Sequence, residues 1–160
     1  MARIDSRSIA GLVFTTLALC GASDAWAKKE CSNHLERRTA AQVMVAHRAA
    51  IAAQDWEAVG CDYAQDAVVS HDQGVTVGRD AIVNDLRMIS GLFAGINPQV
   101  HQEVITPILN HKEMVRLLWS ISTQCMDIED GADTYIVGDG KIHAQTAHGF
   151  PTFKCPPPGP

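Results

Sequence analysis

The sequence lacks the features that mark several large classes of protein. It contains no cluster of Lys and Arg, and its 13 basic residues are outnumbered by 18 acidic ones, for a net charge of -5. This balance argues against a nucleic-acid partner. It also has no internal repeat, no glycine-rich phosphate loop and no coiled-coil heptads. With 46% hydrophobic and 19% charged residues, the 160-residue chain has the composition of one globular domain.

No apolar run reaches the roughly 20 residues that a membrane-spanning helix needs. The longest one, over residues 9–19, follows two arginines and is itself followed by the small-x-small triplet Ala25-Trp26-Ala27. This order is typical of a cleavable export signal over residues 1–27. Lipoprotein cleavage at Cys20 is the alternative, but Leu19 is larger than the residue that such cleavage prefers. We therefore expect a secreted or periplasmic protein that has no membrane contact after cleavage.

Removal of that signal would leave four cysteines, and an even number in an oxidising compartment predicts two disulfides. No two of them are close enough in sequence to resemble a zinc-binding pair. Three pairings are possible, and among them we favour Cys31–Cys155 with Cys61–Cys125. Buried free thiols are the less favoured alternative, because the first and last of these cysteines lie in polar or proline-rich terminal segments.

The first half of the remaining chain has the periodicity of helices. Apolar residues recur at three- and four-residue spacing over 39–54, which predicts one helix with a buried face. Asp55 can cap a second, shorter helix that runs through Asp62. A third helix is predicted over 79–91, and two short strands, 66–70 and 75–77, precede it.

After Pro98 the apolar period changes from helical spacing to two, which is typical of strands. The predicted strands cover residues 100–108, 114–126, 132–137 and 141–147, with Asp139-Gly140 as a hairpin turn between the last two. Helices followed by antiparallel strands predict an α+β fold, with the helices on one face of a curved sheet. We expect a single domain over 28–153, a proline-rich tail over 154–160, and a functional cavity on the concave side of the sheet.

Several segments, in this order, resemble the nuclear transport factor 2-like superfamily. They are Asp55-Trp56-Glu57-Ala58, the stretch from Tyr63 to Val69, Gly78-Arg79-Asp80-Ala81-Ile82, and Asp133 to Val137 running into Asp139-Gly140. The resemblance covers about residues 38–150 and is closest to SnoaL-like and ketosteroid-isomerase-like proteins. It implies a conical α+β barrel with three N-terminal helices and an apolar pocket, and a homodimer formed through the convex sheet. The superfamily includes isomerases, cyclases, dehydratases, epoxide hydrolases and non-catalytic members, so the fold alone does not define the function.

The same resemblance suggests catalytic positions. It places His47 where ketosteroid isomerase has an oxyanion-stabilising tyrosine, and His71 where that enzyme has its general-base aspartate. Asp133 falls near the second, protonated carboxylic acid. Because this chain departs from the isomerase at the first two positions, a steroid substrate is not implied. Histidine titrates near neutral pH, so His71 could accept a proton and His47 could donate to a developing oxyanion. The alternative is that both are hydrogen-bonded core histidines.

Strand alternation predicts further residues that line the cavity. Trp119 and Thr123 would share one face of the long strand, and His143 and Gln145 one face of the last strand. Tyr63 could direct its hydroxyl into the same cavity. We expect these five residues to bind substrate, although Trp119 and Tyr63 could instead serve core packing.

The histidines also raise the question of a metal site. Imidazole and carboxylate groups occur at His71, Asp72, His143 and His148, but no two histidines have helical i, i+4 spacing. We therefore predict neither a metal nor another cofactor.

Two functions remain open. The first is a cofactor-independent acid/base enzyme, an isomerase, dehydratase or cyclase, that acts on a small apolar molecule. The second is an exported domain that binds an apolar ligand or dimerises without catalysis. Convergence of His47, His71 and Asp133 on one open cavity would favour the enzyme.

Overall fold

The computed structural model describes residues 31, 33–92 and 98–155, which form one 3-10 turn, three α-helices and seven strands. The helical elements are η1 (Asn33–Arg37), α1 (Ala40–Ala53), α2 (Trp56–Asp62) and α3 (Arg79–Leu92). The strands are β1 (Tyr63–His71), β2 (Gly74–Val77), β3 (Gln99–Pro107), β4 (Glu113–Ser122), β5 (Met126–Gly138), β6 (Lys141–His148) and β7 (Thr152–Phe153). The predicted export signal and the last five residues of the predicted tail lie outside the described residues. None of the described helices is both long and apolar enough to cross a membrane.

The predicted helices form where their capping residues allow. Thr39 and Gln42 make a capping box at the start of α1, in which each side chain bonds the backbone of the other residue. Asp55 caps α2 by accepting a hydrogen bond from the Ala58 N–H at 3.0 Å. These caps satisfy backbone donors that the first helical turns leave free, and they position α1 with its apolar stripe against the sheet.

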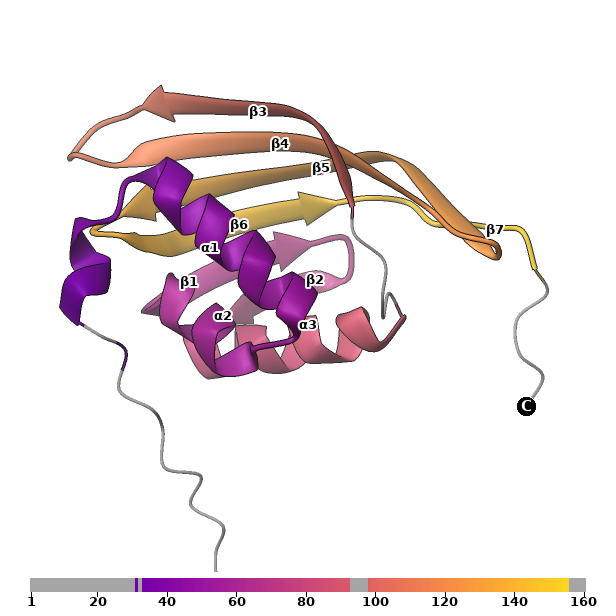
Figure 1. Cartoon of the computed structure of the whole chain (residues 1–160), viewed down its shortest axis with the longest axis horizontal. Coiled ribbons are helices and arrows are strands. Elements are labelled where there is room, and N and C mark those ends of the chain that lie inside the picture. Colours follow the sequence, from indigo (N-terminus) through magenta and orange to yellow (C-terminus); the bar gives the residue numbers. More distant parts are fainter. Residues whose placement is uncertain (1–30, 32, 93–97, 156–160) are drawn as a thin grey trace, which may run out of the picture.

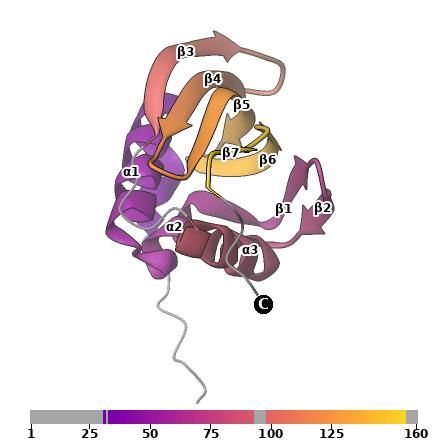
Figure 2. The same cartoon turned by 90° about the vertical axis from the view of Figure 1, so that its right-hand side faces the viewer.

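The sheet is curved, mixed and open, with the strand order β2-β1-β6-β5-β4-β3 and β7 paired to β5. Strand β1 pairs in parallel with β6, and the remaining pairs are antiparallel. Figure 1 shows α1 lying across β4, β5 and β6, and Figure 2 shows how the sheet curves around the helices. The predicted α+β class is confirmed. The sheet has two edges, β2 and β3, and does not close into a barrel.

The long strand ends earlier than its alternating pattern predicted. Strand β4 stops at Ser122, where the Thr123 hydroxyl accepts hydrogen bonds from the N–H groups of Cys125 and Met126, at 3.2 and 2.8 Å. This local turn reverses the chain, since a threonine hydroxyl can bond its own backbone two or three residues on. As a result β5 begins at Met126, six residues before the predicted start. The prediction that Thr123 and Trp119 share one face of the same strand is therefore wrong.

Two disulfides are present, but the predicted pairing is wrong. The bridges join Cys31 to Cys61 and Cys125 to Cys155, with Cα atoms 5.4 and 4.8 Å apart. The first bridge fastens the segment before η1 to α2. The second fastens the chain after β7 to the β4–β5 turn, where the Lys154 N–H also donates to the Cys125 carbonyl at 2.8 Å. Each disulfide therefore joins a terminal segment to a neighbouring element, and neither disulfide links the two ends of the domain to each other.

The core lies between the helices and the helix-covered face of the sheet. Its largest fully buried apolar side chains are Met44, Tyr63, Ile82 and Ile142, which come from α1, β1, α3 and β6. His47 is buried among them at 1% exposure. The opposite face of the sheet carries no helix in the described part of the chain (Figure 2).

Candidate functional site

A cluster of polar side chains lies buried beneath α1, on the helix-covered face of the sheet. We call it the His47 cluster. It consists of His47 from α1, Asp62 from the end of α2, Tyr63 from β1, Asp133 and Tyr135 from β5, and Gln145 from β6. Buried polar groups need partners, so the contacts within the cluster show how its members are held.

A chain of hydrogen bonds runs across three strands of the cluster. The Tyr63 hydroxyl donates to Gln145 Oε1 at 2.5 Å, and Gln145 Nε2 donates to the Tyr135 hydroxyl at 3.3 Å. The Tyr135 hydroxyl in turn donates to Asp133 Oδ2 at 2.9 Å. The sheet brings these groups together because Gln145 lies directly opposite Tyr135 in the β5–β6 register. Each hydroxyl orientation is thereby fixed by its neighbour.

His47 occupies the middle of the cluster. Its Nδ1 lies 3.4 Å from Asp62 Oδ2, within ion-pair distance but without hydrogen-bond geometry, so both atoms are buried without a hydrogen-bond partner among the described residues. The rings of Tyr63 and Tyr135 meet the imidazole edge-on, with centroids 5.3 and 6.2 Å away. His47 is therefore on the buried face of its helix, where an acid and two phenol rings contact it.

Asp62 links the cluster to the N-terminal segment. Its Oδ1 accepts a hydrogen bond from Arg38 Nη1 at 2.7 Å, and Arg38 Nη2 donates to the Gly140 carbonyl at 2.8 Å. The pair is largely buried, with 14% and 4% of the side chains exposed. Sequence reasoning missed Arg38, Asp62 and Tyr135. An acidic residue between the apolar end of a helix and a buried strand was the available signal for Asp62.

The carboxyl group of Asp133 has a pKa that differs from its ordinary value. Burial raises the pKa of Asp133 above its ordinary value, although the Tyr135 hydroxyl, the Trp119 indole and His47 each oppose that rise. Burial and the nearby carboxylates also raise the pKa values of Tyr63 and Tyr135, so both phenols remain protonated donors. Asp133 Oδ1 and Trp119 Nε1 are buried and have no hydrogen-bond partner among the described residues. Both side chains nevertheless keep partial exposure.

His71 does not join this cluster. It pairs with Ala147, which pairs with Asp133, so two strand spacings separate the Cα atoms of His71 and Asp133, or about 10 Å. His71 Nδ1 accepts a hydrogen bond from the Gln73 N–H at 3.2 Å. Its side chain lines a separate hollow of about 250 Å³ between the β1–β2 hairpin and α3. The structure thus brings His47 and Asp133 together and leaves His71 beside them on the same face.

Of the other residues predicted to line the cavity, some lie at the His47 cluster and others lie away from it. Tyr63, Trp119 and Gln145 lie at or beside the His47 cluster, whereas Thr123 is in the β4–β5 turn. The prediction that His143 shares the face of Gln145 is wrong, because the β5–β6 register shifts at His143: Ile142 pairs with Val137 and Ala144 with Ile136. His143 Nε2 lies instead 3.1 Å from the Gly138 carbonyl.

The residues considered for a metal site are also dispersed. His148 Nδ1 lies 3.1 Å from Asp72 Oδ1 as an exposed pair, and His71 and His143 have the separate contacts given above. Within residues 31, 33–92 and 98–155, no three His, Cys, Asp or Glu side chains are grouped as metal ligands would be.

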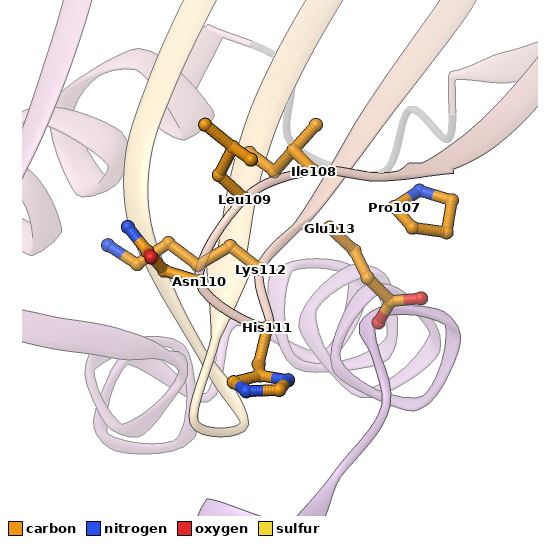
Figure 3. A pocket seen from close by; sticks show the side chains of 7 residues that line it. All are labelled: Pro107, Ile108, Leu109, Asn110, His111, Lys112 and Glu113. Carbon is orange, nitrogen blue, oxygen red and sulfur yellow. The ribbon is translucent and has the colours of Figure 1, made fainter.

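A hollow of about 690 Å³ lies away from the His47 cluster. It is bounded by the β3–β4 turn, residues 107–113 (Figure 3). Glu113 at one end of that turn accepts a hydrogen bond from the Ala40 N–H at 2.9 Å, which ties the turn to the start of α1. Because a single hairpin turn forms it, this hollow is a surface feature of the loop. Neither this hollow nor the one beside His71 is lined by His47 or Asp133.

Comparison with solved structures shows that the fold is that of nuclear transport factor 2-like proteins. An NTF2-like protein of unknown function from Cytophaga hutchinsonii matches with a TM-score of 0.54 at 14% identity, covering 77% of this chain and 94% of that one. A protein from Sinorhizobium meliloti assigned as a polyketide cyclase matches with a TM-score of 0.53 at 18% identity, covering 66% and 92%. The Orange Carotenoid Protein of Anabaena (Nostoc), solved with canthaxanthin bound, matches with a TM-score of 0.53 at 17% identity, covering 66% of this chain and 34% of that one.

No protein-family profile matches the chain, and no curated protein matches it. The likeness to solved structures therefore confirms the expected fold, while the function has to be argued from the site itself.

Proposed function

We propose that this protein binds a small, mostly apolar molecule on the helix-covered face of its sheet, with the polar group of that molecule placed between Asp133 and Trp119. One observation carries the proposal: Asp133 Oδ1 and Trp119 Nε1 are buried close together, near enough for the indole to lower the pKa of the carboxyl, yet neither atom has a partner at hydrogen-bond geometry among the described residues. Buried polar atoms are nearly always paired, and leaving one unpaired costs about 1–3 kcal/mol. Together they present one acceptor and one donor, which a hydroxyl group satisfies by donating and accepting.

The surroundings support an apolar ligand with few polar atoms. Trp119 packs at the border of the hydrophobic core, and Leu117, the next residue along β4 on the same face, is buried. Such a combination of apolar walls and few fixed polar groups is characteristic of small-molecule sites. Among proteins of this fold, one is assigned as a polyketide cyclase and another is solved with canthaxanthin bound, which fits ligands that are largely hydrocarbon.

The binding proposal can be tested with 1-naphthol as the probe and 1-methylnaphthalene as its counterpart without a hydroxyl, by isothermal titration calorimetry. We expect 1-naphthol to bind at least about tenfold more tightly, since a hydrogen bond to a charged group such as a carboxylate contributes about 1.5–3 kcal/mol. Asp133→Leu should remove that preference. Asp130→Leu, an exposed carboxylate three residues earlier on the same strand, is the matched control and should leave it unchanged. Absence of binding of both probes would contradict the proposal.

We further propose that the protein acts outside the cytoplasm. The sequence of residues 1–27 supports export, and the two disulfides support an oxidising compartment, where such bridges persist. N-terminal sequencing of the protein recovered from the periplasm or the medium should begin at Lys28. Recovery of the intact chain from the cytoplasm, with all five cysteines reduced, would contradict this part of the proposal.

Acid/base catalysis without a cofactor is the second candidate function. The raised pKa of Asp133 favours it, because a carboxyl group that ionises closer to neutrality transfers protons more effectively. In this version Asp133 and His47 exchange protons with a bound substrate, and His71 acts from across Ala147 in an isomerisation, dehydration or cyclisation. Compounds that copurify with the native protein, identified by mass spectrometry, would provide the substrate for a pH-dependent assay.

The catalytic roles can then be separated by substitution. His71→Ala should abolish turnover while the unfolding midpoint stays unchanged, because the side chain is partly exposed and outside the core. If turnover survives in His71→Ala but is lost in His47→Gln and Asp133→Asn, the base belongs to the His47 cluster alone. If all three variants retain turnover, none of these residues is the catalytic acid or base.

We also propose that two copies associate through the face of the sheet opposite the helices. Val68, Val77 and Val104 on that face are 37%, 63% and 43% exposed, and no described helix covers them. Exposed apolar surface of this kind is typical of an interface. Light scattering should report a dimer for the wild type and a monomer for Val104→Lys; a monomeric wild type would contradict the proposal.

A further inference from the structure

Trp119 lies flat against the sheet because two positions beneath it are glycine. Gly131 is directly opposite Trp119 in the β4–β5 register. A Cβ atom at position 131 would meet the indole atoms Cδ2, Cε3 and Cε2 at nearly equal distances, all closer than real Cβ atoms approach. Nearly equal distances to three joined ring atoms mean that the Cβ would stand over the face of the ring, not at its edge. The indole therefore rests face-down on the backbone of β5.

The ring extends from β5 to the end of β6. At Gly149, which follows β6, a Cβ atom would lie 3.3 Å from Trp119 Cη2 and 3.0 Å from Ile128 Cγ2. The outer end of the indole thus lies next to a second glycine. A side chain at that position would be closer to the ring than an ordinary van der Waals contact allows. Glycine in a strand interior weakens the strand, so Gly131 within β5 indicates that the close approach of the ring is required there.

The position of the indole against these two glycines determines which of its faces a ligand can contact. One face of the indole is covered by the sheet, and yet the side chain keeps partial exposure, so its accessible surface belongs to the opposite face or the rim. Trp119 has no ring–ring contact with any described residue. The Nε1 atom on its rim lies beside Asp133 and lowers the pKa of that carboxyl. The uncovered side of the indole therefore borders one buried donor, its own Nε1, and one buried acceptor, Asp133 Oδ1.

From this arrangement we infer that the site selects planar, conjugated ring systems that carry a hydroxyl group, and that Gly131 and Gly149 are the residues that determine this specificity by holding Trp119 flat. The inference rests on the proposed binding function and adds the class of ligand. A flat ring gains contact over its whole area on an indole face, whereas a saturated ring of similar size, being puckered, gains less. The donor and acceptor at the rim then fix the orientation of the hydroxyl group.

The experiment compares 1-naphthol with 1-decalol, its fully saturated counterpart, by titration calorimetry on the wild-type protein with both disulfides intact. We expect 1-naphthol to bind about tenfold more tightly. If both bind equally, the planar-ligand inference is overturned while the binding function stands. If neither binds, the proposed function itself fails.

Glycine substitutions test the mechanism of selection. Gly131→Ala should abolish the preference for 1-naphthol, because its methyl group would displace the indole, and Gly149→Ala should reduce it less. Gly60→Ala, in α2, is the matched control, because its Cβ would meet Val83 Cγ2 at an ordinary 3.4 Å, and it should keep the wild-type preference. Retention of that preference in Gly131→Ala would overturn the inference. If Gly131→Ala does not fold, Trp119→Leu serves instead: loss of the preference supports the inference, and an unchanged preference overturns it.

Discussion

Removal of Arg38 should destabilise the protein far more than removal of Arg48, although each arginine makes a carboxylate contact of nearly the same length. Arg38 Nη1 lies 2.7 Å from Asp62, and Arg48 Nη1 lies 2.8 Å from Glu103. The two pairs differ in burial: side-chain exposure is 14% and 4% in the first, against 35% and 26% in the second. Burial, not distance, should therefore decide the cost.

The magnitudes follow from the charge that each substitution leaves behind. In Arg38→Met, Asp62 keeps a buried carboxylate without its guanidinium partner, a situation that costs about 3–5 kcal/mol. The variant also loses the hydrogen bond to the Gly140 carbonyl. In Arg48→Met, the exposed carboxylate of Glu103 is solvated by water, and the cost should stay below about 1 kcal/mol. The two substitutions remove the same chemical group, so each serves as the control for the other.

Urea unfolding followed by far-ultraviolet circular dichroism measures both free energies, with the slope used to confirm that the unfolded states are comparable. The double variant Arg38→Met/Asp62→Asn should be less destabilised than the sum of its single changes, because no unpaired charge remains. A cost for Arg38→Met no greater than that for Arg48→Met would refute the reasoning. It would mean that Asp62 is solvated and that His47 is not held by a buried ion pair.

Three further predictions concern the bridges, a turn and the site. Replacing the cysteines of either disulfide with serine should lower the free energy of unfolding by about 3.6 kcal/mol in the loop-entropy model, since both loops span 30 residues; thermal or urea unfolding tests this, and two or more free thiols in the denatured wild type would contradict the presence of the bridges. Gly140→Ala should cost at least about 2 kcal/mol, because residue 140 has a φ of 68° and its Cβ would overlap the backbone of Leu35; a cost near zero would show that η1 can move away. The raised pKa of Asp133 means that the folded state binds the extra proton, so unfolding free energy should fall as pH rises from about 4 through the folded pKa, and Asp133→Asn should remove this decline.

The overall arrangement was predictable from the sequence because local signals agreed with each other. Helix caps, the switch of apolar period after Pro98 and the Asp139-Gly140 turn all indicate elements that the structure contains. The turn residues have φ values of 50° and 68°, the left-handed conformation that their types tolerate. Such signals depend on neighbouring residues alone, so no tertiary information is needed to read them.

The site was predicted less completely because it depends on register and on distant contacts. A bulge of one residue in the β5–β6 pairing moves His143 away from the face of Gln145, and strict alternation cannot foresee it. The turn after β4 is formed by the Thr123 hydroxyl, and its sequence contains no glycine or proline that would have predicted a turn. Cysteine spacing alone allows three pairings, so the choice among them required the folded positions.

Buried polar partners were also beyond the sequence. The contact between Arg38 and Asp62 joins residues 24 positions apart, and the one between Tyr63 and Gln145 joins residues 82 positions apart. Neither pair has a spacing that marks it as a pair. His47 and Asp133 could be nominated because the family resemblance pointed to their positions, whereas Asp62 and Tyr135 had no such guide.

The parallel pairing of β1 with β6 has a consequence for how the chain must fold. Val68 lies opposite Ala144, 76 positions later, so one side of β1 has no strand partner until nearly the whole chain has been synthesised. Contacts of such long range form slowly, and an unpaired strand edge invites association with other chains in the meantime. A fragment that stops before residue 141 would keep that edge open permanently, so such a fragment is expected to aggregate when it is produced alone.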